Sequence, residues 1–334
     1  MARKKKRKAK KAKRHYLVLI GAVTTIAVIA FLIALIFISH NYIFVPENEI
    51  YVSSVNPQQG DTVLVKASGS YAKVNGVFNN KIITFFRNSN YSDWYAFLGI
   101  DANMGPGEYK ILVNTSGKAI EKEIFVEERD FPSTKMAISQ ELQDKGYTAN
   151  KVLTNISQND NPSLEEVFKK FTSEAYFTGA FSLPLKNVSK SGFDFGEIIK
   201  FTGYDVRHFG IDLRAGLDTK VFAVNDGKVV MARDLSNYGK TIIIDHGLGI
   251  FSLYLHLDKF RVQEGELVIN GQIIALSGDS GYAAGPHLHF SMRDNGSRVD
   301  PVAFIEETSE LKQNLGLASV AEALSRFLNN FMLK

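Results

Sequence analysis

The sequence predicts a mainly β protein in which two β-rich domains follow an apolar N-terminal segment. Its 334 residues suit two domains with extensions. Short runs of β-branched and aromatic residues, separated by Gly, Pro, Asn and Asp, recur over residues 47–128 and 177–304. Helical periodicity is confined to residues 129–176, between these regions, and to the C-terminus. The predicted order is therefore a transmembrane helix, a small β-sandwich, a helical connector, an antiparallel β domain and a C-terminal helix.

The charge of the chain is concentrated at its N-terminus. Residues 1–15 hold 10 of the 39 Lys and Arg residues and no acidic residue, whereas the rest carries 29 basic and 35 acidic side chains. We expect a basic cytoplasmic tail and a mildly acidic folded part, which gives no support for nucleic-acid binding. The chain has no cysteine, and this excludes disulfides and cysteine-based zinc sites.

Residues 16–39 form a run of 24 residues without a charge. At about 1.5 Å per residue, a helix of this length crosses a hydrocarbon core of roughly 30 Å. The basic tail before it favours a cytoplasmic N-terminus. The sequence therefore predicts a single-pass protein of the inner (cytoplasmic) membrane, with its folded part periplasmic or otherwise extracytoplasmic. A cleaved signal peptide is the competing interpretation, but its apolar run is usually shorter and ends in an A-x-A-like site.

The first β-rich region, residues 47–128, shows strand-like runs at 62–65, 81–86, 109–113 and 121–126. Turn residues separate these runs, and short strands at such spacing predict a small β-sandwich. No cluster of His, Asp or Glu with ligand spacing occurs in this region. We therefore expect it to act as a spacer or docking module.

Helical patterns occupy the connector and the C-terminus. In the connector, Ser163 and Glu166 have the spacing of a capping box, which predicts a helix start. Val167, Phe168 and Phe171 then form an apolar stripe, which predicts a packing face. Residues 305–334 are predicted to form an amphipathic helix that could pack on the body, lie on a membrane or meet a partner. Its apolar face holds Val320, Leu324, Phe327, Leu328 and Phe331.

The second β-rich region, residues 177–304, contains five of the seven histidines. Asp226-Gly227 and Asn270-Gly271 are hairpin dipeptides between strand-like runs, so the region should be antiparallel. His287 and His289 are two apart on a predicted strand and should face one cleft.

His208 and Asp212 are four apart, a spacing that shares one face of a strand or of a helix. His256 lies in a strand-like run between the two pairs. Imidazoles and a carboxylate are ligands that zinc prefers, and a catalytic zinc keeps three protein ligands and one open position.

These motifs together resemble the M23 family of zinc metallopeptidases, the lysostaphin- or LytM-type endopeptidases. The resemblance covers roughly residues 180–304. The region upstream is similar to the non-catalytic β-sandwich that precedes the peptidase domain in some members. The motifs that carry the resemblance to the peptidase domain are residues 207–212, 221–230, 238–247, 254–257, 265–274, 278–281, 285–290 and 300–301.

The resemblance implies a Zn²⁺-dependent endopeptidase that cuts the peptide cross-links of bacterial peptidoglycan. By position, His208, Asp212 and His289 match the zinc ligands. His256 and His287 match the two non-ligand histidines of the active site, which assist the attack of water. A sixth position, His246, matches a histidine without a catalytic role, and we expect it to be structural.

A second hypothesis is a non-catalytic scaffold, or an activator of other cell-wall hydrolases, that keeps the fold for protein binding. Some relatives have lost zinc ligands and act in this way. This sequence retains all five active-site positions, which favours the enzyme. Zinc content and the activity of the purified protein distinguish the two hypotheses.

Overall fold

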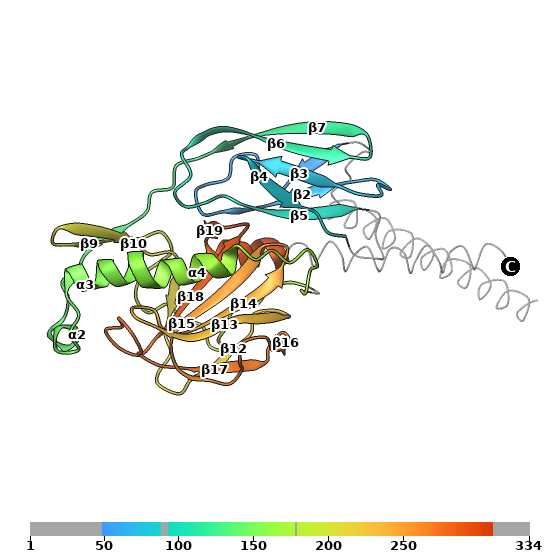
Figure 1. Cartoon of the computed structure of the whole chain (residues 1–334). Coiled ribbons are helices and arrows are strands. Elements are labelled where there is room, and N and C mark those ends of the chain that lie inside the picture. The colour runs from blue at the N-terminus through green and yellow to red at the C-terminus, as the bar shows by residue number, and fades with distance from the viewer. Residues whose placement is uncertain (1–48, 88–92, 178, 310–334) are drawn as a thin grey trace, which may run out of the picture. The chain divides into compact units, whose positions relative to one another are not determined.

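The computed structural model describes residues 49–87, 93–177 and 179–309, which fall within one compact unit, Val45–Lys312. The predicted tail and transmembrane helix, and residues 310–334 of the predicted C-terminal helix, lie outside the described residues. None of the helices in the described ranges is long and apolar enough to span a membrane. The chain is mainly β, with mostly antiparallel sheets, which confirms the predicted fold class at that level (Figure 1).

Residues 50–126 form two antiparallel sheets around one apolar core. The strands are β1 (Ile50–Val52), β2 (Thr62–Ala67), β3 (Asn75–Phe78), β4 (Lys81–Thr84), β5 (Trp94–Gly99), β6 (Gly107–Thr115) and β7 (Lys118–Val126). One sheet has the order β1-β2-β5 and the other β4-β3-β6-β7. Alternation along β6 buries Ile111 and Val113 and exposes Leu112, because successive side chains face opposite sides of a strand. Both sheets contribute to the same cluster of buried residues.

Short helices and a small sheet follow. The sheet has the order β10-β9-β8. The three helical segments that span residues 149–168 follow one another without a break. The elements are β8 (Ser133–Lys135), α2 (Gln140–Asp144), α3 (Ala149–Thr154), the π-helical segment η1 (Asn155–Asp160), α4 (Asn161–Phe168), β9 (Ile198–Phe201) and β10 (Tyr204–Arg207).

The capping box predicted at Ser163 is wrong. Ser163 lies inside the helix, and its hydroxyl donates to the carbonyl of Asn159 one turn earlier. Because Asn159 and the residues before it are already helical, no free N–H groups remain at Ser163 to be capped. The true caps are Ser139 of α2 and Thr148 of α3, whose side chains accept from Leu142 N and Lys151 N.

The remaining strands form a nine-stranded sheet. They are β11 (Ile211–Leu213), β12 (Lys220–Phe222), β13 (Gly227–Leu235), β14 (Gly239–Gly247), β15 (Ile250–Phe260), β16 (Leu267–Val268), β17 (Ile273–Ser277), β18 (Leu288–Asp294) and β19 (Ser297–Val299). The main order is β11-β18-β15-β14-β13-β16, with β12 on β17, β17 also on β15, and β19 on β18. Asp226-Gly227 and Asn270-Gly271 lie between successive strands, but the prediction that they form hairpins is wrong. The strands on either side of each dipeptide do not pair: β12 pairs with β17, β13 with β14 and β16, and β17 with β12 and β15.

Helix α4 packs on one face of this sheet. Leu164 and Val167 join a cluster with Met231, Ile243 and three residues of β15: Phe251, Leu253 and Leu255. Phe168 meets Phe251 with ring centroids 5.2 Å apart. Val167 and Phe168 thus belong to the packing face, as the stripe predicts. Phe171 lies beyond the helix and is 56% exposed, so its assignment to the stripe is wrong.

A further helix occupies residues 301–309 and starts four residues before the predicted boundary. Asp300 begins it, because its carboxylate accepts from Val302 N at 3.0 Å and its carbonyl accepts from Phe304 N at 2.9 Å. Pro301 suits the first helical position, where no N–H donor is needed. Asp300-Pro301 therefore marks a helix start.

Candidate metal centre

Asp212 and His289 meet because they are direct cross-strand partners. Asp212 of β11 pairs with His289 of β18 in the antiparallel register, so both side chains leave the same face of the sheet. The carboxylate oxygen Oδ1 of Asp212 lies 3.1 Å from Nδ1 of His289. Its other oxygen accepts from the backbone N–H of Phe193 at 3.2 Å, which fixes the carboxylate.

His208 reaches the same point from a loop. It follows β10, whereas Asp212 lies in β11, so the prediction that the two share one strand or helix face is wrong. The chain reverses through Gly210, where a Cβ atom would collide with Ser291 and His289. Glycine therefore lets the loop approach β18, and His208 Nε2 comes within 3.1 Å of Asp212 Oδ1 and 2.8 Å of His289 Nδ1.

The hydrogen bonds of the two imidazoles orient their lone pairs toward one another. Nδ1 of His208 lies 3.0 Å from the carbonyl of Asp194, which can only accept, so that nitrogen carries the proton and Nε2 is bare. Nε2 of His289 lies 2.8 Å from the hydroxyl of Ser291, which leaves Nδ1 as the atom that faces the cluster. Two imidazole nitrogens and one carboxylate oxygen thus converge.

Such a set of donors fits a metal cation. Three ligand atoms at 2.8–3.1 Å from one another approach the edge of about 3.4 Å that a tetrahedron with bonds of roughly 2.1 Å requires. Without a cation, protons must separate the lone pairs. Among the described residues no other three His, Asp or Glu side chains gather in this way.

Burial and charge act in opposite directions on these groups. Burial favours the neutral carboxyl of Asp212, but hydrogen bonds from His208 and His289 outweigh it and lower its pKa well below the usual range. Burial lowers the pKa of His289 to about 4, and the neighbouring His208 contributes. The arrangement therefore supplies an ionised carboxylate and, at His289, a neutral imidazole, which are the protonation states that metal ligands need. At His208 burial also acts to lower the pKa, but the hydrogen bond and charge of Asp212 outweigh it and raise the pKa, so a metal bound there would displace a proton.

His256 and His287 lie beside the cluster. Their ring centroids are 4.8 Å apart, and Nε2 of His287 lies 3.8 Å from Asp212 Oδ1. Nδ1 of His256 and of His287 each lie 2.8 Å from a backbone carbonyl, those of Ser280 and Gly285 respectively. Each ring therefore keeps its proton on Nδ1 and a lone pair on Nε2.

The backbone of His256 explains how this residue enters the cavity. Its φ is +59°, a left-handed conformation that is uncommon for residues other than Gly. Leu253 and Leu255 already face the cavity from β15, so strict alternation would turn His256 to the opposite face. The left-handed residue breaks the alternation and lets Leu255 and His256 both line the cavity. Burial, and then His287 and His289, lower the pKa of His256 to about 3, so it is neutral near pH 7.

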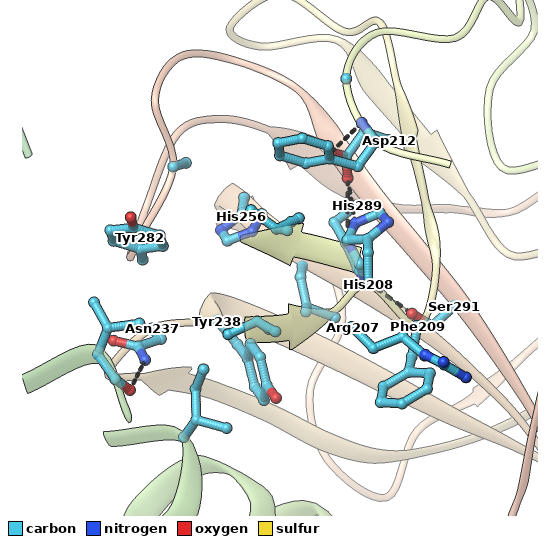
Figure 2. Close-up of a pocket in the computed structure, with 18 of the residues that line it drawn as sticks. Arg207, His208, Phe209, Asp212, Asn237, Tyr238, His256, Tyr282, His289 and Ser291 are labelled. Atoms are coloured by element: carbon cyan, nitrogen blue, oxygen red, sulfur yellow. Dashed lines mark hydrogen bonds and ion pairs between the residues drawn. The ribbon is translucent and has the colours of Figure 1, made fainter. Parts of the chain in front are cut away.

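The site lies in a cavity of about 690 Å³ (Figure 2). Figure 2 shows His208, His289 and Asp212 gathered together, with His256 and Tyr282 to one side. Helix α4 contributes Leu164, Glu165 and Phe168 to the cavity wall, and β18 contributes the floor. The lining on β18 is His289, Ser291 and Arg293, which alternate with the buried Leu288, Phe290 and Met292.

His246 is held elsewhere, and its position agrees with the structural role expected. It is fully buried, with Nδ1 2.7 Å from the carbonyl of Asp226 and Nε2 2.7 Å from the hydroxyl of Ser252. Burial lowers its pKa to about 4, which keeps it neutral.

Sequence reasoning did not identify the groups that hold the histidines. Three are backbone carbonyls, those of Asp194, Ser280 and Gly285, and a carbonyl leaves no signal in a sequence. Ser291 could have been found, because it lies two positions after His289 and must share its strand face.

Comparisons with known proteins agree with this geometry. The family model for peptidase family M23 matches residues 206–301. Peptidoglycan DD-endopeptidase ShyB of Vibrio cholerae is 39% identical over 110 residues, which are 33% of this chain and 26% of that protein. DD-carboxypeptidase/endopeptidase Mpg of Neisseria meningitidis is 40% identical over 106 residues, 32% of this chain and 24% of that protein.

Lysostaphin of Staphylococcus staphylolyticus is 38% identical over 106 residues, covering 30% of this chain and 22% of that protein. The chain thus spans about a quarter of the length of the curated relatives it matches. A crystal structure of a peptidase M23 from Pseudomonas aeruginosa shares the fold, with a TM-score of 0.55 at 24% identity over 75% of this chain and 96% of that one. Residues 206–301 of this chain are therefore similar to peptidase family M23, and this range contains all five of the predicted site residues, His208, Asp212, His256, His287 and His289.

Proposed function

We propose that the protein is a zinc-dependent endopeptidase that hydrolyses peptide cross-links of bacterial peptidoglycan. The observation that carries the proposal is the convergence of His208 Nε2, Asp212 Oδ1 and His289 Nδ1 beside the rings of His256 and His287. Two of the relatives are named as peptidoglycan DD-endopeptidases or DD-carboxypeptidase/endopeptidases, which supports a wall peptide as substrate.

The three converging side chains would hold the metal, and two imidazoles and one carboxylate suit zinc. Zinc held by three protein ligands supplies a Lewis acid that activates water and polarises a carbonyl. The carbonyl of Asp194 keeps His208 in the required tautomer, and the hydroxyl of Ser291, which can accept from Nε2 of His289, orients that ring with its Nδ1 toward the other ligands.

His256 and His287 would handle protons. Each ring presents a bare Nε2, because its Nδ1–H is donated to a backbone carbonyl. A bare Nε2 can accept the proton of the attacking water. Once protonated, the same ring can donate to the oxyanion or to the leaving amine. Both rings line the cavity that would hold the peptide.

The proposal includes the location of the enzyme. We propose that residues 16–39 anchor the chain in the inner membrane, with residues 1–15 in the cytoplasm, so that the catalytic domain meets the wall outside. Peptidoglycan peptides and the membrane are then its partners.

The test combines metal content with cleavage. Purified protein should bind about one zinc per chain and convert cross-linked dimers of isolated peptidoglycan to monomers, as measured by mass spectrometry. His208→Ala should lose both metal and cleavage, whereas His287→Ala should keep most of the metal and lose cleavage at least about 100-fold. His256→Ala should behave like His287→Ala, because its ring is the other member of the pair beside the metal ligands.

Two results would contradict the proposal. Hydrolysis by a zinc-free His208→Ala protein would exclude a metal mechanism. One zinc per chain in a protein that cleaves no wall preparation would instead favour the scaffold or activator.

A further inference from the structure

Two arginines lie on the cavity floor, away from the metal centre. Arg293 of β18 and Arg298 of β19 are direct partners in the antiparallel register, and both line the cavity. Arg293 shares the strand face of His289 and Ser291, because the three alternate along β18. Arg293 lies four positions after His289, which is about 13 Å along the strand. Like charges directly opposite one another on a sheet are destabilising, so the stability cost of this arginine pair calls for a functional explanation.

Aromatic rings hold the guanidinium of Arg293. It lies 5.6 Å from the ring centroid of Phe168 of α4 and 5.9 Å from that of Phe209. Its Nε and Nη1 atoms are buried and have no hydrogen-bond partner, and within the described ranges no carboxylate lies at ion-pair distance from it. Buried polar atoms are normally hydrogen-bonded, so two unpaired donors on one charged group point to a missing acceptor.

Arg298 is only partly neutralised. Its guanidinium lies 4.5 Å from the Phe209 ring centroid, and its nearest carboxylate is Asp101, at 3.7 Å. Burial, and then Arg298, lower the pKa of Arg293 to about 10, so Arg293 remains protonated at neutral pH. Tyr238, Asp101 and Glu165 act in the other direction. Glu165 lines the same cavity from α4, but it forms no ion pair with Arg293.

We propose that Arg293, assisted by Arg298, binds a carboxylate of the peptide substrate at a subsite along β18 from the metal centre. This inference rests on the proposed function, which it deepens by naming the substrate as an acidic peptide. An extended peptide rises about 3.3 Å per residue, so the recognised carboxylate lies within about four residues of the scissile bond.

The chemistry suits a carboxylate better than a neutral group. Guanidinium nitrogens form a planar fork that matches the two oxygens of a carboxylate. The cation–π contacts with the rings of Phe168 and Phe209 hold the guanidinium without using its donors. A neutral amide in the same place would accept fewer hydrogen bonds and would leave the charge unpaired.

The experiment compares substrates that differ only in charge. The full chain is given cross-linked peptide dimers with free glutamate and diaminopimelate carboxyls, and dimers in which either or both carboxyls are amidated. We expect kcat/KM to be at least about 10-fold higher for the dimer with the recognised carboxyl free. The single amidations identify which carboxyl that is.

Three variants locate the effect. Arg293→Met should abolish the preference, mainly by raising KM for the carboxylate dimer, with zinc content unchanged. Arg293→Lys keeps the charge without the fork and should retain part of the preference. Arg261→Met, which removes an exposed arginine outside the cavity lining, should change neither parameter.

Failure of the proposed subsite can be distinguished from failure of the proposed endopeptidase function. Cleavage of all dimers at equal rates by the wild-type protein would overturn the subsite and leave the endopeptidase standing. An equal loss for every dimer in Arg293→Met, with lowered thermal stability, would show that Arg293 only supports α4. Absence of cleavage of any dimer by the zinc-loaded protein would overturn both the subsite and the proposed function.

Discussion

His289 depends on a residue two positions further along its own strand. Ser291 is buried, and its hydroxyl is the partner of His289 Nε2 at 2.8 Å. A partner on the outer nitrogen fixes the tautomer and the ring orientation of a ligand histidine. Ser291 therefore determines which nitrogen of His289 faces Asp212.

Removal of this hydroxyl should weaken metal binding without unfolding the protein. We expect Ser291→Ala to lower zinc affinity by about 10-fold, because partners of this kind typically contribute 10- to 100-fold. Competition with a zinc chelator measures the affinity. Ser157→Ala, which removes a hydroxyl from an exposed position in the connector, is the control and should bind zinc as the wild type does. Unchanged affinity in Ser291→Ala would show that ring packing alone orients His289.

At the scale of elements, the connector holds a loop of the active site. The carboxylate of Asp160, at the end of η1, accepts from the backbone N–H groups of Ser236, Asn237 and Tyr238, at 3.0, 2.7 and 3.4 Å. This loop joins β13 to β14, and the carbonyl of Tyr238 accepts from His256 N at 3.1 Å. Asp160 is therefore linked to His256 through the backbone of Tyr238.

Neutralising this carboxylate should loosen the loop. Asp160 is almost fully buried, so Asp160→Asn keeps the shape but weakens hydrogen bonds that gain from the charge. We expect a loss of about 1–3 kcal/mol in the free energy of unfolding and a lower kcat, because His256 loses its support.

Denaturant titration and steady-state kinetics measure the two effects. Asp144→Asn, in the exposed part of the connector, is the matched control and should leave both quantities unchanged. A full kcat in a destabilised Asp160→Asn protein would separate the loop from catalysis.

For the molecule as a whole, a buried acid on β18 links stability to pH. Asp294 is 1% exposed; its Oδ1 accepts from the side chain of Asn295 at 3.0 Å, and its Oδ2 has no partner among the described residues. Burial raises its pKa to about 7, although Asn295, the N–H of Gly99 and Lys81 oppose this.

The direction of this pH dependence follows from the number of protons that the folded and unfolded states bind. Between about pH 4 and pH 7 the folded state holds a proton on Asp294 that the unfolded state has released, so stability falls as pH rises through this window. Asp294→Asn should therefore match the wild type near pH 4 and exceed it at pH 8 by a few kcal/mol, at most about 4. The difference in unfolding free energy between the two proteins at each pH checks this. A difference that does not change between pH 4 and pH 8 would show that Asp294 ionises normally.

Much of the fold was readable from local patterns. Alternation along β18 and the apolar residues Val167 and Phe168 of α4 each follow from short-range geometry. Asp226-Gly227 marks a turn, but the strands on either side of it pair with other strands instead of forming a hairpin. Errors arose where neighbouring elements decided the outcome. Ser163 has the spacing of a cap, but helical residues before it already supply the bonds, and Phe171 fits the stripe although the helix has ended.

By itself, the sequence determined the mainly β class and the five residues whose types suit a zinc peptidase, because residue chemistry and strand period are local properties. Only the tertiary structure decided how they meet. His208 and Asp212 belong to different segments that converge through Gly210, and His256 enters the cavity through a left-handed backbone. Three further contacts also depend on packing. They are the hydrogen bond between Ser291 and His289, the hydrogen bonds from the loop of residues 236–238 to Asp160, and the contact of Arg293 with the ring of Phe168. Such contacts depend on register and packing between segments, which no local pattern encodes.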